Sequence, residues 1–374
     1  MRPRTAAALA ATTLLGAGTA AVAAGRHACD AALVPARPLP SDPRLTVHAT
    51  TADTVTLTRS LATLRPGTYG LAGNGVHAVV GPVVDDPDCP PDSVVRRLER
   101  VVHGGLRHGT KVYLTPQVHI GDPDRALGLE YEDVEIPGEL GPLPAWFLPG
   151  ARSTWVITAH GLGTTREHPM VVLPFLTGQG LPVLDLAYRG DPGAPRSPDG
   201  TGHLGDTEWR DLDAAIRYAV HRGAERVVLH GWSTGAAMAV HAVANSPLRD
   251  RVGGMVLDSP VLDWHTTVRA LAAAQGTPRA LLPLVVRAAE GRAGLGAYSL
   301  AEASAPSRVR VPTLVVHGPD DRLAPWDASR LLAERRPDLV TLHPVHDAPH
   351  GCMWNADPER YEEALRRFLT PLMS

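Results

Sequence analysis

The amino-acid sequence predicts an α/β fold, in which a mostly parallel central sheet is flanked by helices and a smaller strand-rich extension precedes it. Two patterns support this fold class. From about Gly128 onward, short apolar runs alternate with amphipathic helical segments, as expected when crossover helices join parallel strands. Residues 45–127 instead carry short runs broken by Gly, Pro and Asp, which favours strands joined by turns. With 374 residues, the chain is long enough to bury a full core.

The first segment, residues 1–24, has the pattern of an export signal. Arg2 and Arg4 precede an uncharged stretch that ends in small residues, as in segments recognised for secretion. A stretch of this length can also remain as a membrane anchor, although its Ala, Thr and Gly residues supply little transfer energy. We therefore expect an exported protein, either secreted or anchored on the extracytoplasmic face of the cell membrane, and we favour cleavage over anchoring.

Residues 25–44 are rich in Pro and Ala without a period, which predicts a linker. Most of the runs in the extension over 45–127 predict strands, whereas residues 93–102 (SVVRRLERVV) have helical spacing. The extension contains no cluster of catalytic residue types. We therefore expect a small accessory module, whose role the sequence does not define.

The composition is that of an ordinary globular protein. Hydrophobic residues make up 44% and charged residues 20% of the chain, and the formal net charge is -3, so no nucleic-acid partner is expected. Cys29, Cys89 and Cys352 are an odd and sparse set that predicts no disulfide framework, although one bridge is possible. No cluster of metal ligands or phosphate-binding loop is found, so we expect no metal or organic cofactor. The oligomeric state is not predicted.

The main domain is expected over 128–374. Its first part, residues 129–150, reads as a hairpin, and apolar runs such as TWVITAHG, RVVLHGWS and TLVVHGP then predict strands. Amphipathic helices are expected over 206–223 and after Asp357, which caps a helix with Pro358 at its first position. In such sheets the functional site lies beyond the carboxyl ends of the strands.

A candidate nucleophile lies at one of these strand ends, in the motif GWSTG. The motif follows the apolar strand RVVLH and opens an alanine-rich helical segment, which is the setting of a nucleophile elbow. Gly231 and Gly235 leave room for the strained turn, and the helix amino terminus behind Ser233 stabilises negative charge. A serine that merely caps a helix is the alternative, but the setting favours a nucleophile.

With this motif in its strand–turn–helix setting, the chain resembles the α/β-hydrolase superfamily over 128–374. The resemblance implies an acid after a late strand and a histidine in the last loop before the final helix. The motif HGPDD then identifies Asp321 as the acid, and His350 lies just before the terminal helix. Asp320 beside the predicted acid, and Asp258 at a position used by some relatives, remain alternatives.

His346 is the alternative to His350, but it lies at the end of the preceding expected strand. A histidine is needed because a serine hydroxyl is a poor nucleophile until a neutral imidazole accepts its proton. A carboxylate is needed in turn to fix the imidazole tautomer and stabilise its cation. Asp321, His350 and Ser233 are therefore expected to converge.

An oxyanion hole would complete this site, with two N–H donors directed at the developing negative charge. The N–H of Thr234, directly after the nucleophile, is the first candidate. The segment TAHGLGTT resembles the His-Gly turn of the superfamily, which makes the N–H of Leu162 the second candidate. His160 is expected to brace that turn.

Residues 261–311 are expected to form a helical cap over the site, as in many members of the superfamily. Their apolar faces suggest a pocket for acyl or other apolar groups. Trp232, Trp264 and Trp354 are candidates to line it, although plain packing in the core is as good an explanation for each.

The sequence thus predicts a serine hydrolase that cleaves a carboxylic ester, or a related acyl bond, through an acyl-enzyme. Peptidase, thioesterase and acyltransferase activities use the same groups and remain alternatives, because a fold does not fix a substrate. A catalytically silent binding protein of the cell envelope is the alternative of another class.

Overall fold

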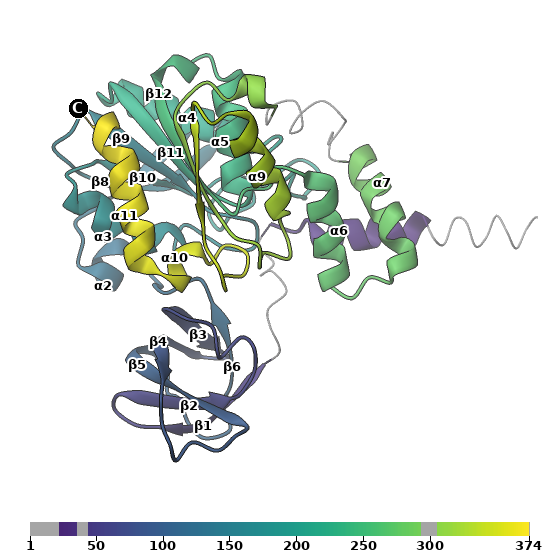
Figure 1. Cartoon of the computed structure of the whole chain (residues 1–374). Helices are drawn as coiled ribbons and strands as arrows, with labels where there is room; N and C mark the ends of the chain where they lie inside the picture. Colours follow the sequence, from purple (N-terminus) through teal and green to yellow (C-terminus); the bar gives the residue numbers. More distant parts are fainter. Residues whose placement is uncertain (1–21, 36–43, 293–304, 374) are drawn as a thin grey trace, which may run out of the picture.

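The computed structural model describes residues 22–35, 44–292 and 305–373, which form a small barrel and a larger α/β unit (Figure 1). The barrel closes in the order β1-β2-β5-β4-β3-β6, and the strand pairs are antiparallel. Its strands are β1 (Leu45–Thr50), β2 (Thr54–Thr58), β3 (Tyr69–Gly73), β4 (Val76–Val84), β5 (Ser93–His103) and β6 (Lys111–Thr115).

The helical spacing read over residues 93–102 is wrong, because these residues lie in strand β5. The pairing of β4 with β5 has several register shifts. At the start of β5, residues 93–96 are all buried, so adjacent residues such as Val94 and Val95 do not alternate between buried and exposed. In the sequence, adjacent apolar residues of this kind look like the apolar face of a helix.

The larger unit is built on an eight-stranded sheet in the order β14-β13-β12-β11-β9-β10-β8-β7. The hairpin of β7 and β8 is antiparallel, whereas β9 to β14 pair in parallel. This arrangement confirms the predicted fold class. The strands are β7 (Glu132–Pro137), β8 (Pro142–Leu148), β9 (Thr154–Ala159), β10 (Val183–Leu186), β11 (Arg226–Trp232), β12 (Val252–Asp258), β13 (Thr313–His317) and β14 (Val340–Pro344).

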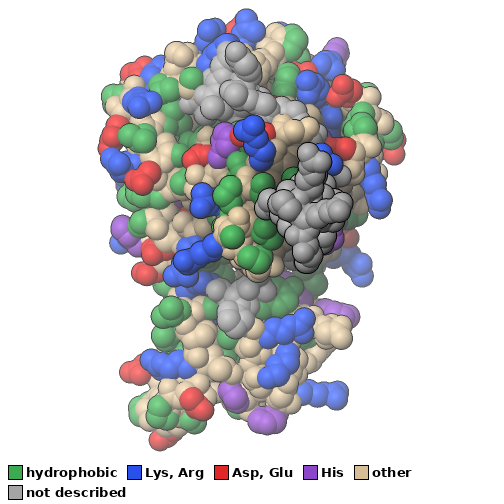
Figure 2. Space-filling model, turned by 90° about the vertical axis from the view of Figure 1, so that its right-hand side faces the viewer, with side chains coloured by type: hydrophobic (Ala, Val, Ile, Leu, Met, Phe, Trp, Pro, Cys, Tyr) green, Lys and Arg blue, Asp and Glu red, His purple; other side chains and the backbone are tan. Residues whose placement is uncertain are grey.

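Helices cover both faces of this sheet. On one face, α4 (Trp209–His221), α5 (Thr234–Asn245) and α9 (Trp326–Arg335) bury side chains such as Leu212 and Leu332. On the other face lie α3 (Leu173–Gly178) and α11 (Pro358–Leu369), with Tyr361 and Leu365 in the core. The short helices α2 (Pro123–Leu127) and α10 (Met353–Ala356) lie between the barrel and the sheet (Figure 1). Charged side chains of both signs are interspersed over the face shown in Figure 2.

The helices α6 (Trp264–Ala274) and α7 (Leu282–Arg292) occupy the expected cap region and project from the α/β unit (Figure 1). Residues 22–32 form a further helix, drawn in purple, beside them. Cys29, Ala32 and Leu33 are buried in one cluster with side chains of α6 and α7.

The predicted linker over 25–44 is therefore wrong for its first part. Alanine has the highest helix propensity and dominates this stretch, whereas its prolines begin only at Pro35. Residues 36–43, and residues 1–21 of the predicted export signal, lie outside the described residues. No helix in the described ranges is long and apolar enough to cross a membrane.

Candidate active site

Ser233 lies at a sharp turn between β11, which ends at Trp232, and α5, which begins at Thr234. Its φ is 52°, a conformation that costs about 1–3 kcal/mol for a residue other than glycine. A Cβ at position 231 would lie 2.3 Å from the backbone of Gly235, and one at position 235 would lie 2.0 Å from the oxygen of Ala159. Both glycines are therefore required for this turn, as the motif predicted.

The structure brings together the three residues that the sequence singled out. His350 Nε2 lies 2.7 Å from Ser233 Oγ, and His350 Nδ1 lies 2.7 Å from Asp321 Oδ2. With Nδ1–H donating to the carboxylate, Nε2 is free to accept the serine proton. Ser233 and Asp321 are buried at the carboxyl end of the sheet.

None of the three alternative residues forms a hydrogen bond with Ser233 Oγ or the His350 ring in the described structure. Asp320 points away from this relay, and its Oδ2 accepts the backbone N–H of Asp347. His346 is exposed to solvent. Asp258 is buried at the end of β12, where its Oδ1 accepts the hydroxyl of Ser259 at 2.7 Å.

The carboxylate of Asp321 is surrounded by donors. Oδ1 accepts the backbone N–H groups of Leu323 and Ala324 at 2.8 and 2.9 Å, and Oδ2 accepts from His350 and His317. Burial alone would raise its pKa, but the charge of His350 and the hydrogen bonds from both histidines hold the pKa well below its usual value. Asp321 is therefore ionised at neutral pH. Burial lowers the pKa of His350, but the charge of Asp321 outweighs it and the pKa lies above 6.5.

His317 is a member of this cluster that the sequence reasoning missed. Its Nε2 lies 3.0 Å from Asp321 Oδ2, and its Nδ1 lies 2.8 Å from the hydroxyl of Ser329. Since a carboxylate only accepts, Nε2 carries the proton and Nδ1 accepts from Ser329. His317 lies four residues before Asp321 in HGPDD, and this spacing was the available signal.

The two predicted oxyanion donors flank the serine. Thr234 begins α5 directly after it, and a Cβ at Gly161 would lie only 2.9 Å from Ser233 Cβ. The turn that carries Leu162 therefore packs directly on the nucleophile. No hydrogen bond joins the N–H of Leu162 to another residue in the described part of the chain.

His160 braces this turn from beneath. Its Nδ1 lies 2.9 Å from the carbonyl oxygen of Gly161, and its Nε2 lies 2.7 Å from Asp191 Oδ2. Burial lowers the pKa of His160, but the charge and the hydrogen bond of Asp191 outweigh it, so the pKa is raised. Because both partners only accept, both ring nitrogens of His160 carry protons.

The aromatic candidates for the pocket lie mostly in the core. Trp232 is 1% exposed, and its ring stacks on His230 with centroids 4.0 Å apart, so its pocket assignment is wrong. A strand followed by a sharp turn directs this side chain beneath the sheet rather than over the serine. Trp354 donates to Glu362 at 3.3 Å, and Trp264 is buried in the cap cluster that includes Leu162.

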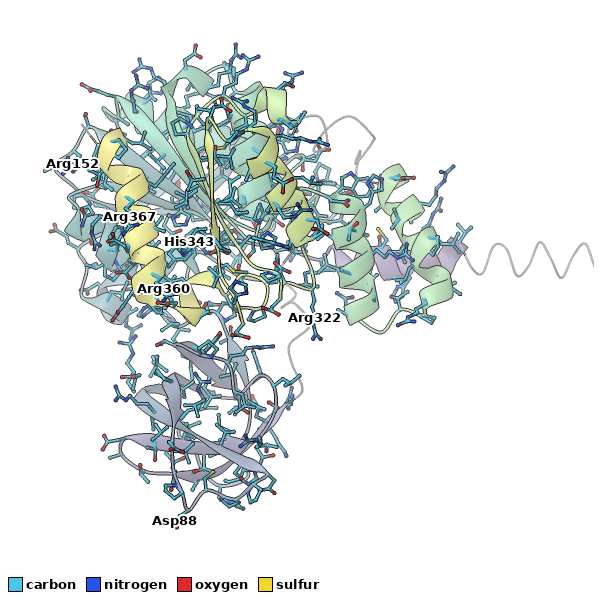
Figure 3. The ribbon with its side chains drawn as sticks, in the orientation of Figure 1. Asp88, Arg152, Arg322, His343, Arg360 and Arg367 are labelled. Carbon is cyan, nitrogen blue, oxygen red and sulfur yellow. The ribbon has the colours of Figure 1, made fainter. Side chains whose placement is uncertain are left out.

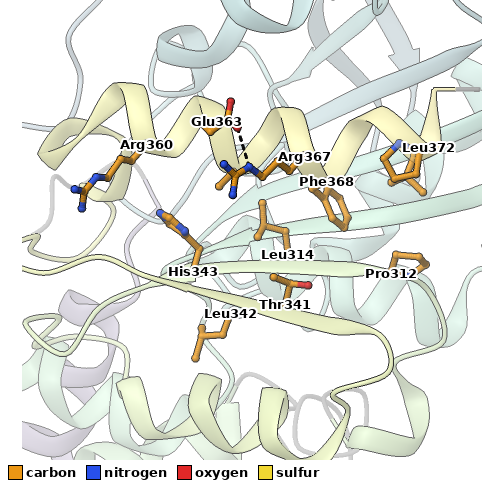
Figure 4. A pocket seen from close by; sticks show the side chains of 12 residues that line it. Pro312, Leu314, Thr341, Leu342, His343, Arg360, Glu363, Arg367, Phe368 and Leu372 are labelled. Atoms are coloured by element: carbon orange, nitrogen blue, oxygen red, sulfur yellow. Dashed lines mark hydrogen bonds and ion pairs between the residues drawn. The ribbon is translucent and has the colours of Figure 1, made fainter.

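A groove of about 590 Å³ lies between β13, β14 and α11, away from Ser233. Its floor is apolar, and His343, Arg360 and Arg367 lie at its rim (Figures 3 and 4). Arg367 is paired with Glu363 at 2.7 Å and Arg360 with Asp357 at 3.3 Å. The groove includes none of the residues that surround the serine. Among the described residues, no three His, Cys, Asp or Glu side chains form a metal site, and Cys29, Cys89 and Cys352 form no disulfide.

Comparison with known proteins places this geometry in a family. The model of the prolyl oligopeptidase family matches residues 169–372, more than half of the chain. The chain belongs to this family. As a member, it is a serine hydrolase of the α/β-hydrolase superfamily, as the resemblance implied. A domain of unknown function (DUF8805) matches residues 46–115, which correspond to the barrel.

The relatives and solved structures that resemble this family member each match about two thirds of the chain. The uncharacterized protein YfhR of Salmonella typhimurium is 27% identical over 290 residues, which is 70% of this chain and 92% of that protein. The esterase Pf2001 of Pyrococcus furiosus is 25% identical, with a TM-score of 0.55, over 68% of this chain and 96% of the esterase. Est1E of Butyrivibrio proteoclasticus, solved with ferulic acid, shares the fold at 16% identity and a TM-score of 0.50, over 64% of this chain and 98% of Est1E.

Proposed function

We propose that this family member hydrolyses carboxylic esters through a Ser233–His350–Asp321 triad and an acyl-enzyme. The observation that carries the proposal is the continuous pair of 2.7 Å contacts from Ser233 Oγ through the His350 ring to Asp321 Oδ2. The likeness to the Pyrococcus furiosus esterase supports an ester as the substrate.

In the first half-reaction, Ser233 Oγ attacks the ester carbonyl while His350 Nε2 takes the hydroxyl proton. The ionised Asp321 stabilises the imidazolium that forms. His350 then returns the proton to the leaving alcohol as its C–O bond breaks, which leaves Ser233 acylated. Water attacks the acyl-enzyme with the same histidine as base, and the carboxylic acid and free Ser233 are released.

The oxyanion of each tetrahedral intermediate would accept from the N–H groups of Thr234 and Leu162. The amino terminus of α5, which begins at Thr234, adds a favourable dipole there. Removing one such donor typically costs about 3 kcal/mol in the transition state. His160 holds the Leu162 turn in place through its contact with the carbonyl oxygen of Gly161. Like the triad, these roles are part of the proposal.

Peptide cleavage is the second candidate, and membership of the prolyl oligopeptidase family favours it. Thioester cleavage and acyl transfer use the same steps, with a different leaving group or a different acceptor. A panel of p-nitrophenyl esters, acyl thioesters and aminoacyl-prolyl amides, assayed under one set of conditions, separates these activities. The ester assignment requires the highest kcat/KM to be found among the esters.

A fluorophosphonate probe tests for the enzyme itself, because it reacts with activated serines only. We expect stoichiometric labelling of the folded wild type and none after Ser233→Ala or heat unfolding. In ester hydrolysis, Ser233→Ala should lower kcat by about 10⁴-fold or more. A folded wild type that resists the probe would instead favour a silent binding protein.

We further propose that the protein acts outside the cytoplasm, with a small acyl substrate, and is secreted or held at a membrane by its first residues. Cleavage at the small residues near Ala24 would leave the buried Cys29, Ala32 and Leu33 in place. Amino-terminal sequencing of the mature protein tests this, since an intact first residue excludes cleavage.

A further inference from the structure

We propose that the barrel is a positioning module for the loop that carries His350, and that Asn355 is the positioning residue through which it acts. The inference rests on the proposed function, because it assigns a role in the reaction of the same site. The barrel lies directly against the segment between β14 and α11 (Figure 1).

Asn355 joins the two units by three hydrogen bonds. Its side-chain amide donates to the carbonyl oxygens of Thr68 and Pro116 at 2.9 and 3.1 Å. Its own carbonyl oxygen accepts the N–H of Thr68 at 2.8 Å. The residue is 1% exposed, and the loss of such buried donors leaves acceptors without partners at a cost in free energy.

The barrel backbone approaches Asn355 more closely than a side chain would allow. A Cβ at Gly67, whose φ is +84°, would lie 1.9 Å from the carbonyl oxygen of Asn355. Only glycine permits this contact. It fixes the position of the loop relative to the turn that joins β2 to β3.

A buried cation holds that turn in shape. Arg96 of β5 is 0% exposed, and its guanidinium donates to the carbonyl oxygens of Thr63, Arg65 and Gly67 at 2.7–3.0 Å. It also donates to Gly81 of β4. One side chain thus ties the turn that contacts Asn355 to the wall of the barrel.

The loop is held from both ends. On the catalytic side, the N–H of Gly351 donates to Ser259 Oγ at 3.0 Å. The carbonyl oxygen of Gly351 lies 3.1 Å from His168 Nε2. On the other side, Cys352 is buried among barrel side chains. His350 therefore lies at the edge of a segment clamped between the α/β core and the barrel.

This clamp matters for the reaction because His350 must keep two contacts of 2.7 Å at once. A displacement of about 1 Å at a catalytic group can reduce the rate on the order of 100-fold. Loosening Asn355 should therefore impair proton transfer more than substrate binding. It should also weaken the contact with Asp321 that raises the pKa of His350.

The test compares Asn355→Ala and Asn355→Asp with the control Thr154→Val. Thr154 is also buried and bonds a distant backbone oxygen, that of Leu372, at 3.2 Å, but its contact is remote from the His350 loop. In folded protein, we expect Asn355→Ala to lower kcat and the rate of fluorophosphonate labelling by about tenfold, with KM within threefold. Asn355→Asp, whose carboxylate faces two carbonyl oxygens, should lower both by about 100-fold. Thr154→Val should change both less than twofold.

The pKa of His350, followed by NMR, gives a readout that does not depend on turnover. It should fall toward 6.5 in Asn355→Ala and stay unchanged in Thr154→Val. An unchanged pKa in a folded Asn355→Ala variant, or labelling as fast as in the wild type, overturns the inference. If the aspartate variant fails to fold, the alanine variant decides alone. A wild type that shows the raised pKa but resists the probe would refute the proposed function and leave the positioning result standing.

Discussion

Asp258 ends β12 and Asp321 follows the neighbouring strand β13, and both are buried near the reactive serine, yet the pKa values of their carboxyl groups are shifted in opposite directions. The pKa of Asp321 is held low by two histidines, which outweigh its burial. Burial raises the pKa of Asp258 to about 7, against hydrogen bonds from the Ser259 and Tyr361 hydroxyls and the charge of His350, which lower it less. Burial is common to both residues, so the number of charged and N–H donors makes the difference.

The comparison shows why Asp321, and not Asp258, can serve as the acid of the triad. A carboxylate can stabilise the imidazolium of His350 only if it is itself charged, and only donors can keep it charged away from water. The turn after β13 supplies two N–H groups and the β13 strand supplies His317. Asp258 lacks such donors and lies one strand nearer the nucleophile, where its backbone oxygen accepts the N–H of Ser233 at 2.8 Å.

The sharpest test of this comparison is Asp321→Asn. The amide keeps the shape but cannot stabilise the cation or hold the same tautomer, so kcat should fall by about 10³–10⁴-fold. Asp320→Asn is the matched control, because its carboxylate is adjacent but exposed and outside the relay. It should change kcat less than twofold. A similar loss in both variants would mean that the relay does not run through Asp321.

The sequence already indicated which residues converge, because strand ends of a parallel sheet meet at one edge and chain order follows the superfamily pattern. Ser233, Asp321 and His350 were found in this way. Trp232 was misassigned because its ring stacks on His230 in the core, and the motif itself does not state which face of the sheet this side chain takes. The helix over residues 22–32 was missed because the prolines that follow it dominated the interpretation.

Contacts across long sequence distances were beyond prediction. Asn355 bonds Thr68, and Arg96 bonds the turn over 63–67, through backbone carbonyl groups that every residue possesses. Neither contact leaves a compositional signal. The burial of β5 in the barrel likewise depends on the distant strands β2 and β4 that pair with it, and its sequence alone resembled a helix.

His317→Ala is expected to have the next largest effect. The variant removes one charge-assisted hydrogen bond from Asp321 Oδ2 and leaves the hydroxyl of Ser329 without its ring partner. Such bonds contribute about 1.5–3 kcal/mol, so kcat should fall by roughly 10- to 100-fold. The variant His317→Gln retains a donor and should recover part of the loss. Equal activity of the alanine variant and the wild type would show that His350 and the backbone N–H groups alone hold Asp321.

The pH dependence of the reaction should follow the raised pKa of His350. Only neutral His350 accepts the proton of Ser233, so kcat/KM should fall about tenfold per pH unit below that pKa. The acid limb should therefore lie above pH 6.5, the value of an unperturbed histidine. In Asp321→Asn the residual activity should show this limb at lower pH, since the charge that raises the pKa is gone. If the acid limb of Asp321→Asn lies at the same pH as that of the wild type, Asp321 is not the carboxylate that raises the pKa of His350.

Asp258→Asn should have the smallest effect on turnover, below about threefold, because Asp258 is about half neutral at pH 7 and acts on His350 only through its partial charge, the smallest of the influences on the pKa of His350. The main effect of this substitution should instead be on the free energy of unfolding and its dependence on pH. A folded pKa of about 7 lies above the unfolded value of 3.8, so the contribution of Asp258 is fully present below pH 4 and is lost as the pH rises through 7. Asparagine does not titrate. The free energy of unfolding of the variant, measured by urea denaturation, should therefore rise relative to that of the wild type between pH 4 and pH 8, by up to about 4 kcal/mol.

The relative stability of Asp321→Asn should change with pH in the opposite direction, because a carboxyl group with a depressed pKa contributes stability that is present at neutral pH and lost in acid. Parallel pH profiles for the two variants would show that both carboxyl groups are in the same state.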